Sequence, residues 1–431
     1  MNNWSIGPID AWIIATAICC NVACGLLGCF LVLRRMSLLG DAVSHAILPG
    51  LVIAFMLSNS RAMGPMLIGA MLVGLFTAFM IEALQRWGKV PEDASMGVVF
   101  TSLFALGVVL ITRYAANVDL DPGCVLYGLI EFVPLDRISL LGHEIPRATV
   151  TLGFVLVVVV FLIAAFYKEL TIVSFDPYLA TTMGINAALV HYALMAAVAA
   201  ATVAAFEAVG SILVVAMLIA PGATAHLLTD RLSRMLWIAA GVAVVSAVVG
   251  YMLAAHPRLN TSVAGMMSVV AGAQFALAVF FAPRHGYVSK LLHQVALSLR
   301  IAAEDILGML YRWEEARRDA PLTRDQIVAA MAGGLTPRLA LLRLLRGGHI
   351  ESAVGAAVRL TESGRARAGS LVRTHRLWES YLAQHLGLPL DHVHEPAQRM
   401  EHFVTPRITE QLDAQLGAAQ DPHGKEIPPA P

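Results

Sequence analysis

The feature that most constrains the fold of this 431-residue sequence is a sharp change in hydrophobicity near residue 283. Up to about Phe281 the chain is a series of apolar stretches, each near the ~20 residues that cross a bilayer as a helix. From Pro283 onward charged residues are dense and no apolar stretch is long enough to span. The sequence therefore predicts an all-α polytopic membrane protein that carries a mostly α-helical, polar tail.

Nine segments of the first part are candidate transmembrane helices: 11–33, 41–58, 63–84, 94–114, 148–167, 187–206, 209–229, 235–254 and 262–282. The run 187–229 is apolar almost throughout and is interrupted only around Glu207 and Gly210, so eight or ten spans also remain possible. Pro49-Gly50 predicts a break within the second segment, as in the broken helices of transporters.

Basic residues in the short loops indicate the orientation, because cytoplasmic loops carry an excess of Lys and Arg. With nine spans, one side carries Arg34-Arg35, Arg86 with Lys89, Lys168, Arg231 with Arg234, and Arg284 with Lys290. The other side has fewer basic residues and an acidic loop that includes Asp119 and Asp121. We therefore expect the N-terminus outside and the polar tail in the cytoplasm.

Composition excludes several other classes of protein. The formal net charge is zero, so bulk charge favours no nucleic-acid partner. Four of the five cysteines lie in the first apolar segment, where they are most simply packing residues, so a disulfide framework is not expected. The chain has no Gly-x-x-x-x-Gly-Lys-Ser/Thr phosphate loop, so we expect that it binds no nucleotide and is not an enzyme.

Asp41 and His45 form the first candidate metal site. They lie four residues apart in an apolar segment, so on a helix both side chains leave from one face. An ionisable residue at membrane depth is costly unless it is paired or faces water, which makes it a functional candidate. Carboxylate and imidazole donors suit Mn²⁺, Fe²⁺ or Zn²⁺. The alternative is an Asp that caps the helix start beside a satisfied polar histidine.

The tail begins with the pattern of a helix-turn-helix unit. Apolar residues recur at helical spacing over 290–315, and Thr323 with Gln326 forms a capping-box pattern. Gly333-Gly334 and Gly347-Gly348 end two short helices, and His349–Leu360 fits a β-hairpin wing. The alternative is a small helical domain with no nucleic-acid role.

A second candidate metal site follows in the tail. His375 and Glu379 are four residues apart, and a further polar set recurs on one helical face: His394, Gln398, Glu401 and His402. Two helices that each present nitrogen and oxygen ligands predict a divalent-cation site. Charged residues on solvated faces are the alternative.

The membrane part resembles the membrane subunits of ABC-type manganese, zinc and iron importers. The similar stretches are Gly28–Gly50, Glu92–Leu110, Asp176–Gly184 and Pro221–Ala225, within residues 10–285. The resemblance implies a bacterial inner (plasma) membrane, Asp41 and His45 as ligands in the translocation path, and a helix over Ser174–Ile185 that docks on an ABC ATPase subunit. The residues that this helix contributes are Ser174, Phe175, Asp176, Pro177, Tyr178, Leu179, Ala180, Met183 and Gly184. Further implied partners are an extracytoplasmic solute-binding protein and a second permease subunit.

The tail resembles the iron- and manganese-dependent repressors over about residues 300–431. The similar stretches are Leu360–Arg365, Leu371–Glu379, Val393-His394, Glu401-His402 and Asp421–Gly424. The resemblance implies that Asp305, Glu401 and His402 belong to a primary metal site and that His375, Glu379 and His394 are further ligands. Gln398 stands where those proteins carry Cys or Glu, and Gly308 where manganese-type members can carry Glu. The segment 336–346 lacks the polar face that reads base edges, so DNA binding is not expected.

These patterns together predict three domains: a metal permease at 1–285, a winged-helix-like domain at 286–370 and a metal-binding, dimerisation-like domain at 371–431. The predicted function is import of Mn²⁺, Fe²⁺ or Zn²⁺ as an ABC permease subunit with a metal-sensing tail. A membrane-tethered metal-dependent transcription regulator and a proton-coupled metal transporter are the alternatives.

Overall fold

The computed structural model describes residues 7–36, 42, 46–58, 63–114, 130–140, 143–259, 261–316, 321–352, 357–417 and 419–430. Asp41 and His45 lie outside these ranges. The chain divides into two compact units, Met1–Ser289 and Lys290–Pro431. We refer to them as the membrane unit and the tail.

The membrane unit consists of apolar helices. Seven of them, within the described ranges, are long and apolar enough to cross a membrane: α1 (Pro8–Leu33), α4 (Met63–Arg86), α5 (Glu92–Tyr114), α7 (Arg147–Ala165), α10 (Ala187–Val209), α12 (Leu232–Ala254) and α13 (Val263–Phe281). Two shorter apolar helices complete the nine predicted segments, α3 (Leu48–Ser58) and α11 (Ser211–Leu228). The fold class predicted from the sequence is confirmed.

The break predicted around Gly210 is observed, whereas at the other predicted position, Pro49-Gly50, both residues lie within α3 and the turn comes before them. Gly210 separates α10 from α11 with φ 77°, a left-handed conformation that glycine adopts without a steric penalty. Ile47 forms a turn between helical Ala46 and the first residue of α3. Pro49 therefore lies in the first turn of α3, where its missing N–H is tolerated.

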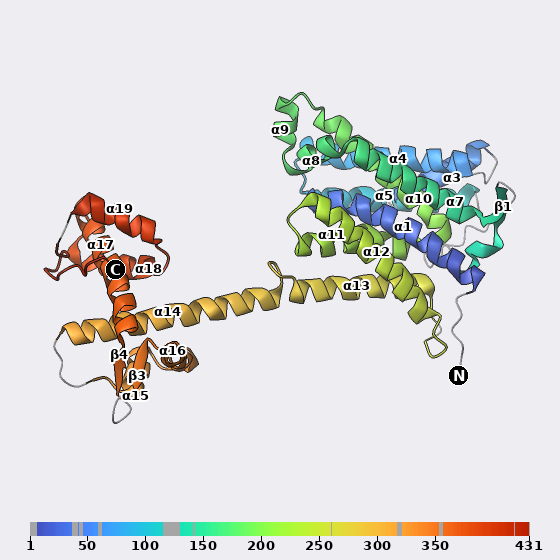
Figure 1. The fold of residues 1–431 in the computed structure, drawn as a ribbon. Helices are drawn as coiled ribbons and strands as arrows, with labels where there is room; N and C mark the ends of the chain where they lie inside the picture. Colours follow the sequence, from blue (N-terminus) through green and yellow to red (C-terminus); the bar gives the residue numbers. More distant parts are fainter. Residues whose placement is uncertain are drawn as a thin grey trace. The chain divides into compact units, whose positions relative to one another are not determined.

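Helix α1 is the centre of the membrane unit and packs against α7, α10, α11 and α12 (Figure 1). Its close contact with α11 depends on Gly28, because a Cβ there would lie 1.8 Å from the carbonyl oxygen of Leu218. Gly222 of α11 faces the same crossing, where a Cβ would lie 2.9 Å from the carbonyl carbon of Gly28. Small residues at helix crossings are the usual means of close packing in membranes.

Short elements connect these helices. A 3₁₀ turn, η1 (Ile130–Leu135), precedes a hairpin of β1 (Arg137–Leu140) and β2 (His143–Pro146). Beyond α7, the chain forms α8 (Tyr167–Phe175) and α9 (Pro177–Thr182) before α10. The predicted coupling segment, Ser174–Ile185, therefore consists of the end of α8, the joining residue Asp176, all of α9 and the turn that follows α9.

The tail begins within α14 (Tyr287–Glu315), which is followed by α15 (Arg324–Ala330), α16 (Leu335–Arg346) and the antiparallel strands β3 (Ile350–Ser352) and β4 (Val358–Leu360). Thr323 and Gln326 form the predicted capping box at the start of α15. The C-terminal half of α14 packs against these elements around Ile306, Leu307 and Leu341. This part of the tail is therefore the predicted helix-turn-helix with a hairpin wing.

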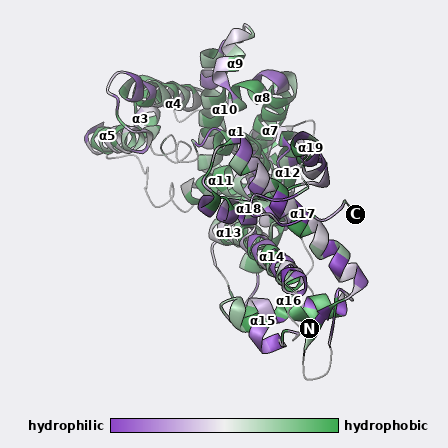
Figure 2. Ribbon diagram, turned by 90° about the vertical axis from the view of Figure 1, so that its left-hand side faces the viewer, coloured by the Kyte–Doolittle hydropathy of each residue, from purple (hydrophilic) through white to green (hydrophobic). Residues whose placement is uncertain are grey.

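The rest of the tail consists of α17 (Glu362–His385), η3 (Leu390–His392), α18 (His394–Glu401) and α19 (Pro406–Leu416). Helix α17 packs against α18 and α19. Helix α17 continues through residue 370, which was the predicted boundary between the winged-helix-like domain and the metal-binding domain. The boundary between these two domains therefore stays a prediction. Figure 2 shows mostly hydrophobic α3, α4, α5 and α10, whereas α17, α18 and α19 carry hydrophilic residues.

Candidate metal centre and transport surface

The tail holds a cluster of metal-ligand side chains that meet from three helices. Helix α17 supplies His375 and Glu379, one turn apart on a single face. Helix α18 and the residue after it supply His394, Glu401 and His402. Helix α14 supplies Asp305. Six of the seven residues predicted from the sequence therefore lie in two neighbouring groups.

The first group consists of His375, Glu379 and His394. The Nε2 atom of His375 lies 3.0 Å from Glu379 Oε1 and 3.1 Å from His394 Nδ1, and the latter two atoms are 2.9 Å apart. Two nitrogens and one carboxylate oxygen thus form a triangle with edges near 3 Å. This spacing and donor set match the ligands of one small divalent cation.

The second group consists of Asp305, Glu401 and His402. The Nε2 atom of His402 lies 3.2 Å from Asp305 Oδ1 and 3.8 Å from Glu401 Oε1. Its other ring nitrogen, Nδ1, donates to Glu304 Oε2 at 3.0 Å. Because that hydrogen bond fixes the proton on Nδ1, Nε2 is left to act as a ligand.

His375 and Glu401 join the two groups. His375 Nδ1 lies 2.7 Å from Glu401 Oε2, and the two side chains are only 3% and 4% exposed. When the imidazole is protonated the two atoms form a buried ion pair, although they lack the geometry of a hydrogen bond. A cation shared between the nitrogen and carboxylate donors would take the place of the proton and satisfy both atoms. The residues present therefore fit a divalent metal.

The protonation of the cluster follows from its carboxylates. Burial by itself lowers the pKa of His402, but the carboxylates of Asp305 and Glu304 outweigh this effect and raise that pKa to about 9. Burial by itself raises the pKa of Glu379, but hydrogen bonds from His375 and His394 lower it to about 2. Without a metal, His402 is therefore a charged imidazolium at neutral pH and pairs with the carboxylates of Asp305 and Glu304.

The structure departs from the sequence-based prediction at two residues, Gln398 and Glu304. The side chain of Gln398 is exposed on α18, whereas Glu401 on the same helix is buried, so its role as a ligand stays a prediction. Glu304 was not predicted, although it is adjacent to Asp305. It is buried and also accepts hydrogen bonds from Arg300 at 3.1 Å and Arg367 at 3.3 Å. Helical periodicity alone gave no signal for it, because its partner lies 98 residues away.

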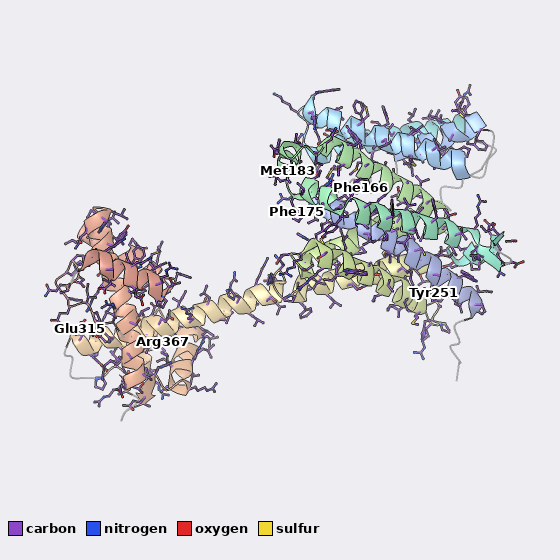
Figure 3. The ribbon with its side chains drawn as sticks, turned by 45° about the horizontal axis from the view of Figure 1, so that its top comes forward. Phe166, Phe175, Met183, Tyr251, Glu315 and Arg367 are labelled. Atoms are coloured by element: carbon purple, nitrogen blue, oxygen red, sulfur yellow. The ribbon has the colours of Figure 1, made fainter. Side chains whose placement is uncertain are left out.

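A second candidate functional surface lies at α8 and α9 of the membrane unit. Asp176 caps α9, accepting hydrogen bonds at Oδ1 from the backbone N–H groups of Tyr178 and Leu179, both at 3.0 Å. The apolar side chains around it point outward, since Tyr178 is 84% exposed and Phe175 and Met183 are also exposed. Figure 3 shows Phe175 and Met183 at the same end of the membrane unit. Of the predicted coupling residues, only Ser174 and Ala180 are buried.

Arg34 connects this surface to the end of α1. Its Nε donates to Ser174 Oγ of α8 at 3.3 Å, and its Nη1 donates to His191 Nδ1 of α10 at 3.3 Å. The three residues line a cavity of about 470 Å³. Nothing local in the sequence pairs Arg34 with α8 or α10, so these contacts were not predicted.

The fold and the two surfaces define a class of protein, a polytopic helical membrane protein with a polar tail that carries a candidate metal centre. The chain matches the profile of the "ABC 3 transport family" over residues 9–282, and it belongs to that family. It also matches the profile "Iron dependent repressor, metal binding and dimerisation domain" over residues 361–429. Both resemblances found in the sequence are therefore confirmed.

Known relatives and one solved structure agree with this assignment. The chain is 48% identical over 284 residues to the manganese transport system membrane protein MntD of Bacillus subtilis, which covers 66% of this chain and 95% of the relative. It is 43% identical over 287 residues to the zinc transport system membrane protein TroD of Treponema pallidum, covering 67% and 78%. A structure of PsaBC from Streptococcus pneumoniae in complex with Fab matches with a TM-score of 0.56 and 31% identity, covering 65% of this chain and 95% of that chain. The protein is therefore a multi-pass inner-membrane protein of a transport family.

Proposed function

We propose that this chain is the permease subunit of an ABC importer for a divalent transition metal, with Mn²⁺ as the first candidate cargo, and that its tail senses the same class of metal. One observation carries the proposal: two converging groups of nitrogen and oxygen ligands stand in a chain that is 48% identical to a manganese permease. Imidazole and carboxylate donors suit Mn²⁺, Fe²⁺ and Zn²⁺. The names of the relatives favour Mn²⁺ first and Zn²⁺ second.

Asp41 and His45 are the proposed ligands of the cargo in the membrane. They lie in the sequence between α1 and α3, and a turn at Ile47 precedes the first residue of α3. Interrupted helices are typical of transporter sites, since they free backbone carbonyls beside charged side chains. The two side chains would replace part of the hydration shell of the ion on its way through the membrane unit.

The exposed apolar surface of α8 and α9 is the proposed docking site of the ATPase subunit. Its residues Phe175, Tyr178, Leu179 and Met183 are large, apolar and exposed, which is typical of a protein–protein contact. Arg34 directly follows the last residue of α1 and hydrogen-bonds to Ser174 of α8. From Arg34 the sequence continues to Asp41. Motion at α9 would thus reach the metal path through a hydrogen-bonded contact.

The remaining partners follow from the proposed import. An external solute-binding protein would deliver the metal, and a second permease subunit would complete the pathway. The loop charges support an orientation with the N-terminus outside and the tail in the cytoplasm.

For the tail we propose regulation of transport. Metal held by Asp305, His375, Glu401 and His402 would reduce transport when the cytoplasmic metal concentration is high. A ligand alters the transport equilibrium only if it binds the two transporter states with different affinity. The metal would neutralise the carboxylates around His375 and His402, which in its absence are paired with these imidazoles.

The test is metal accumulation in cells that express the whole transporter, measured for Mn²⁺, Fe²⁺ and Zn²⁺. We expect Asp41→Ala and His45→Ala to abolish uptake of the cargo. We expect His375→Ala with His402→Ala to retain uptake but to lose its decline at high metal concentration. Equal uptake by the wild type and both path variants, at equal expression, would contradict the proposed path. An unchanged decline in the tail variant would contradict regulation.

A further inference from the structure

Helix α16 presents an apolar surface where a DNA-reading helix would present polar side chains. Four of its residues, Pro337, Ala340, Leu341 and Leu344, are buried against the tail core. The opposite face carries three leucines: Leu335 is 75% exposed, Leu339 48% and Leu342 46%. At 100° per residue these three leucines lie within one narrow sector directly away from the core.

Arginines surround this leucine sector. Arg338 lies on one side of it, Arg343 on the other, and Arg346 continues it at the C-terminal end, and all three are exposed. Helix α16 has no acidic residue in its twelve positions. The outward face is thus apolar at its centre and positively charged at its margins.

This composition does not suit sequence reading on DNA. Base edges are recognised by bidentate hydrogen bonds from side chains such as Asn, Gln and Arg at the centre of the recognition surface. Leucines at that position offer no hydrogen bond, and the arginines stand at the margins. The face has the chemistry of an interfacial helix instead, in which leucines enter the acyl boundary and arginines contact lipid phosphates.

The connection between the two units is short. Helix α13 of the membrane unit ends at Phe281 and α14, within which the tail begins, starts at Tyr287, so only residues 282–286 separate the two helices. The tail is thus tethered to a membrane unit, which raises its effective concentration at a lipid surface. A second copy of the chain is a poorer occupant, because three leucines offer far less than the roughly 800 Å² per partner of a stable interface.

We propose that α16 is a membrane contact: Leu335, Leu339 and Leu342 insert at the headgroup level of an anionic bilayer, and Arg338, Arg343 and Arg346 bind lipid phosphates. This inference goes beyond the proposed transport function and does not depend on metal binding by the tail. It assigns the helix-turn-helix unit of this chain to the lipid surface.

The test uses the full chain in nanodiscs of phosphatidylcholine alone or of equal parts phosphatidylcholine and phosphatidylglycerol. Leu339→Cys carries an environment-sensitive fluorophore, and the equally labelled parent chain supplies the background from native cysteines. Glu362→Cys is the matched control, since Glu362 is exposed in the same tail outside α16. We expect a blue shift and protection from aqueous acrylamide at Leu339→Cys only in discs that contain phosphatidylglycerol.

Two further variants separate the contributions of charge and of the apolar face. Arg338→Gln with Arg343→Gln should remove the difference between the two lipids, and high salt should weaken it in the parent. Leu335→Gln with Leu342→Gln should abolish the shift. The same emission in both lipids and at Glu362→Cys would overturn the proposal. A shift that persists in detergent would also overturn it, because the neighbour would then be protein.

Discussion

The role of Glu304 gives the sharpest test of the candidate metal centre, because this residue touches a ligand without belonging to either ligand group. Its Oε2 accepts a hydrogen bond from His402 Nδ1 at 3.0 Å, and its side chain is 9% exposed. We expect Glu304→Gln to weaken metal binding by the tail. The amide keeps the volume and one acceptor oxygen but loses the negative charge that strengthens the hydrogen bond.

The size of the effect follows from the bond that is changed. A hydrogen bond to a charged group contributes about 1.5–3 kcal/mol and a neutral one about 0.5–1.5 kcal/mol. The difference of about 1.4 kcal/mol corresponds to about tenfold in affinity. Glu304→Ala leaves Nδ1 of His402 with no acceptor from this side chain, so we expect a loss of about 100-fold, the upper range for second-shell changes.

The assay is equilibrium binding of Mn²⁺ and Zn²⁺ to the purified full chain in chelator-buffered solutions, compared with the wild type. Proton competition changes the size of the loss: without the Glu304 charge His402 binds its proton less tightly, which offsets part of the loss at low pH. The full loss should therefore appear only as the pH approaches the His402 pKa of about 9. Glu314→Gln is the control, since this α14 carboxylate pairs with Arg365 and not with a ligand. Equal affinities for Glu304→Gln and Glu314→Gln across the pH range would refute the reasoning.

Three further predictions concern the two units. Gly28→Ala should destabilise the membrane unit by at least about 1–3 kcal/mol, since its Cβ would overlap the carbonyl of Leu218. The measurement is heat unfolding, and the control is Gly272→Ala, which should show no loss because a Cβ there meets no atom within 4 Å. Asp176→Ala should remove the cap of α9, at a cost of about 0.5–2 kcal/mol in helix stability, and lower ATP-driven uptake, whereas Asp176→Asn keeps a capping oxygen and should retain most uptake. Hydrogen bonds from Arg376 hold the pKa of Glu315 below its ordinary 4.5, so this contact stabilises the tail above pH 4.5 and is lost as the pH falls through the folded-state pKa. Glu315→Gln should therefore destabilise the tail at pH 7 and make progressively less difference below pH 4.5, as measured by the pH dependence of its unfolding; an equal loss at both pH values would contradict this account.

Much of the fold could be predicted because it depends on local patterns. The lengths of the apolar segments fixed the helices of the membrane unit, and Gly210 marked the break between α10 and α11 in advance. The capping box at Thr323 and the glycine pairs after it marked α15 and α16 in the same way. Of the predicted span 41–58, the structure describes Ala42 and residues 46–58, within which α3 begins at Leu48, and the remaining residues lie outside the described ranges.

The candidate site was predictable in its residues but not in its arrangement. The spacing of His375 with Glu379 and the adjacency of Glu401 and His402 are visible in the sequence, because ligands on one helix recur at fixed intervals. The contact of His375 Nδ1 with Glu401, and of His402 with Glu304, joins different helices. Contacts between different helices leave no periodic pattern in the sequence, so they can be identified only from the tertiary structure. For the same reason Arg34 could not be connected to Ser174.

The sequence by itself determined the class of each half of this protein: apolar segments of membrane length in one, and amphipathic helices with nitrogen and oxygen ligands in the other. These properties follow from composition and period, which act within one helix at a time. The tertiary structure decided which faces meet. It brought Asp305 and Glu304 of α14 beside His402, and it left the leucines of α16 uncovered while Leu341 and Leu344 entered the core. Long-range contacts depend on how whole helices pack, and that information is spread over the entire chain.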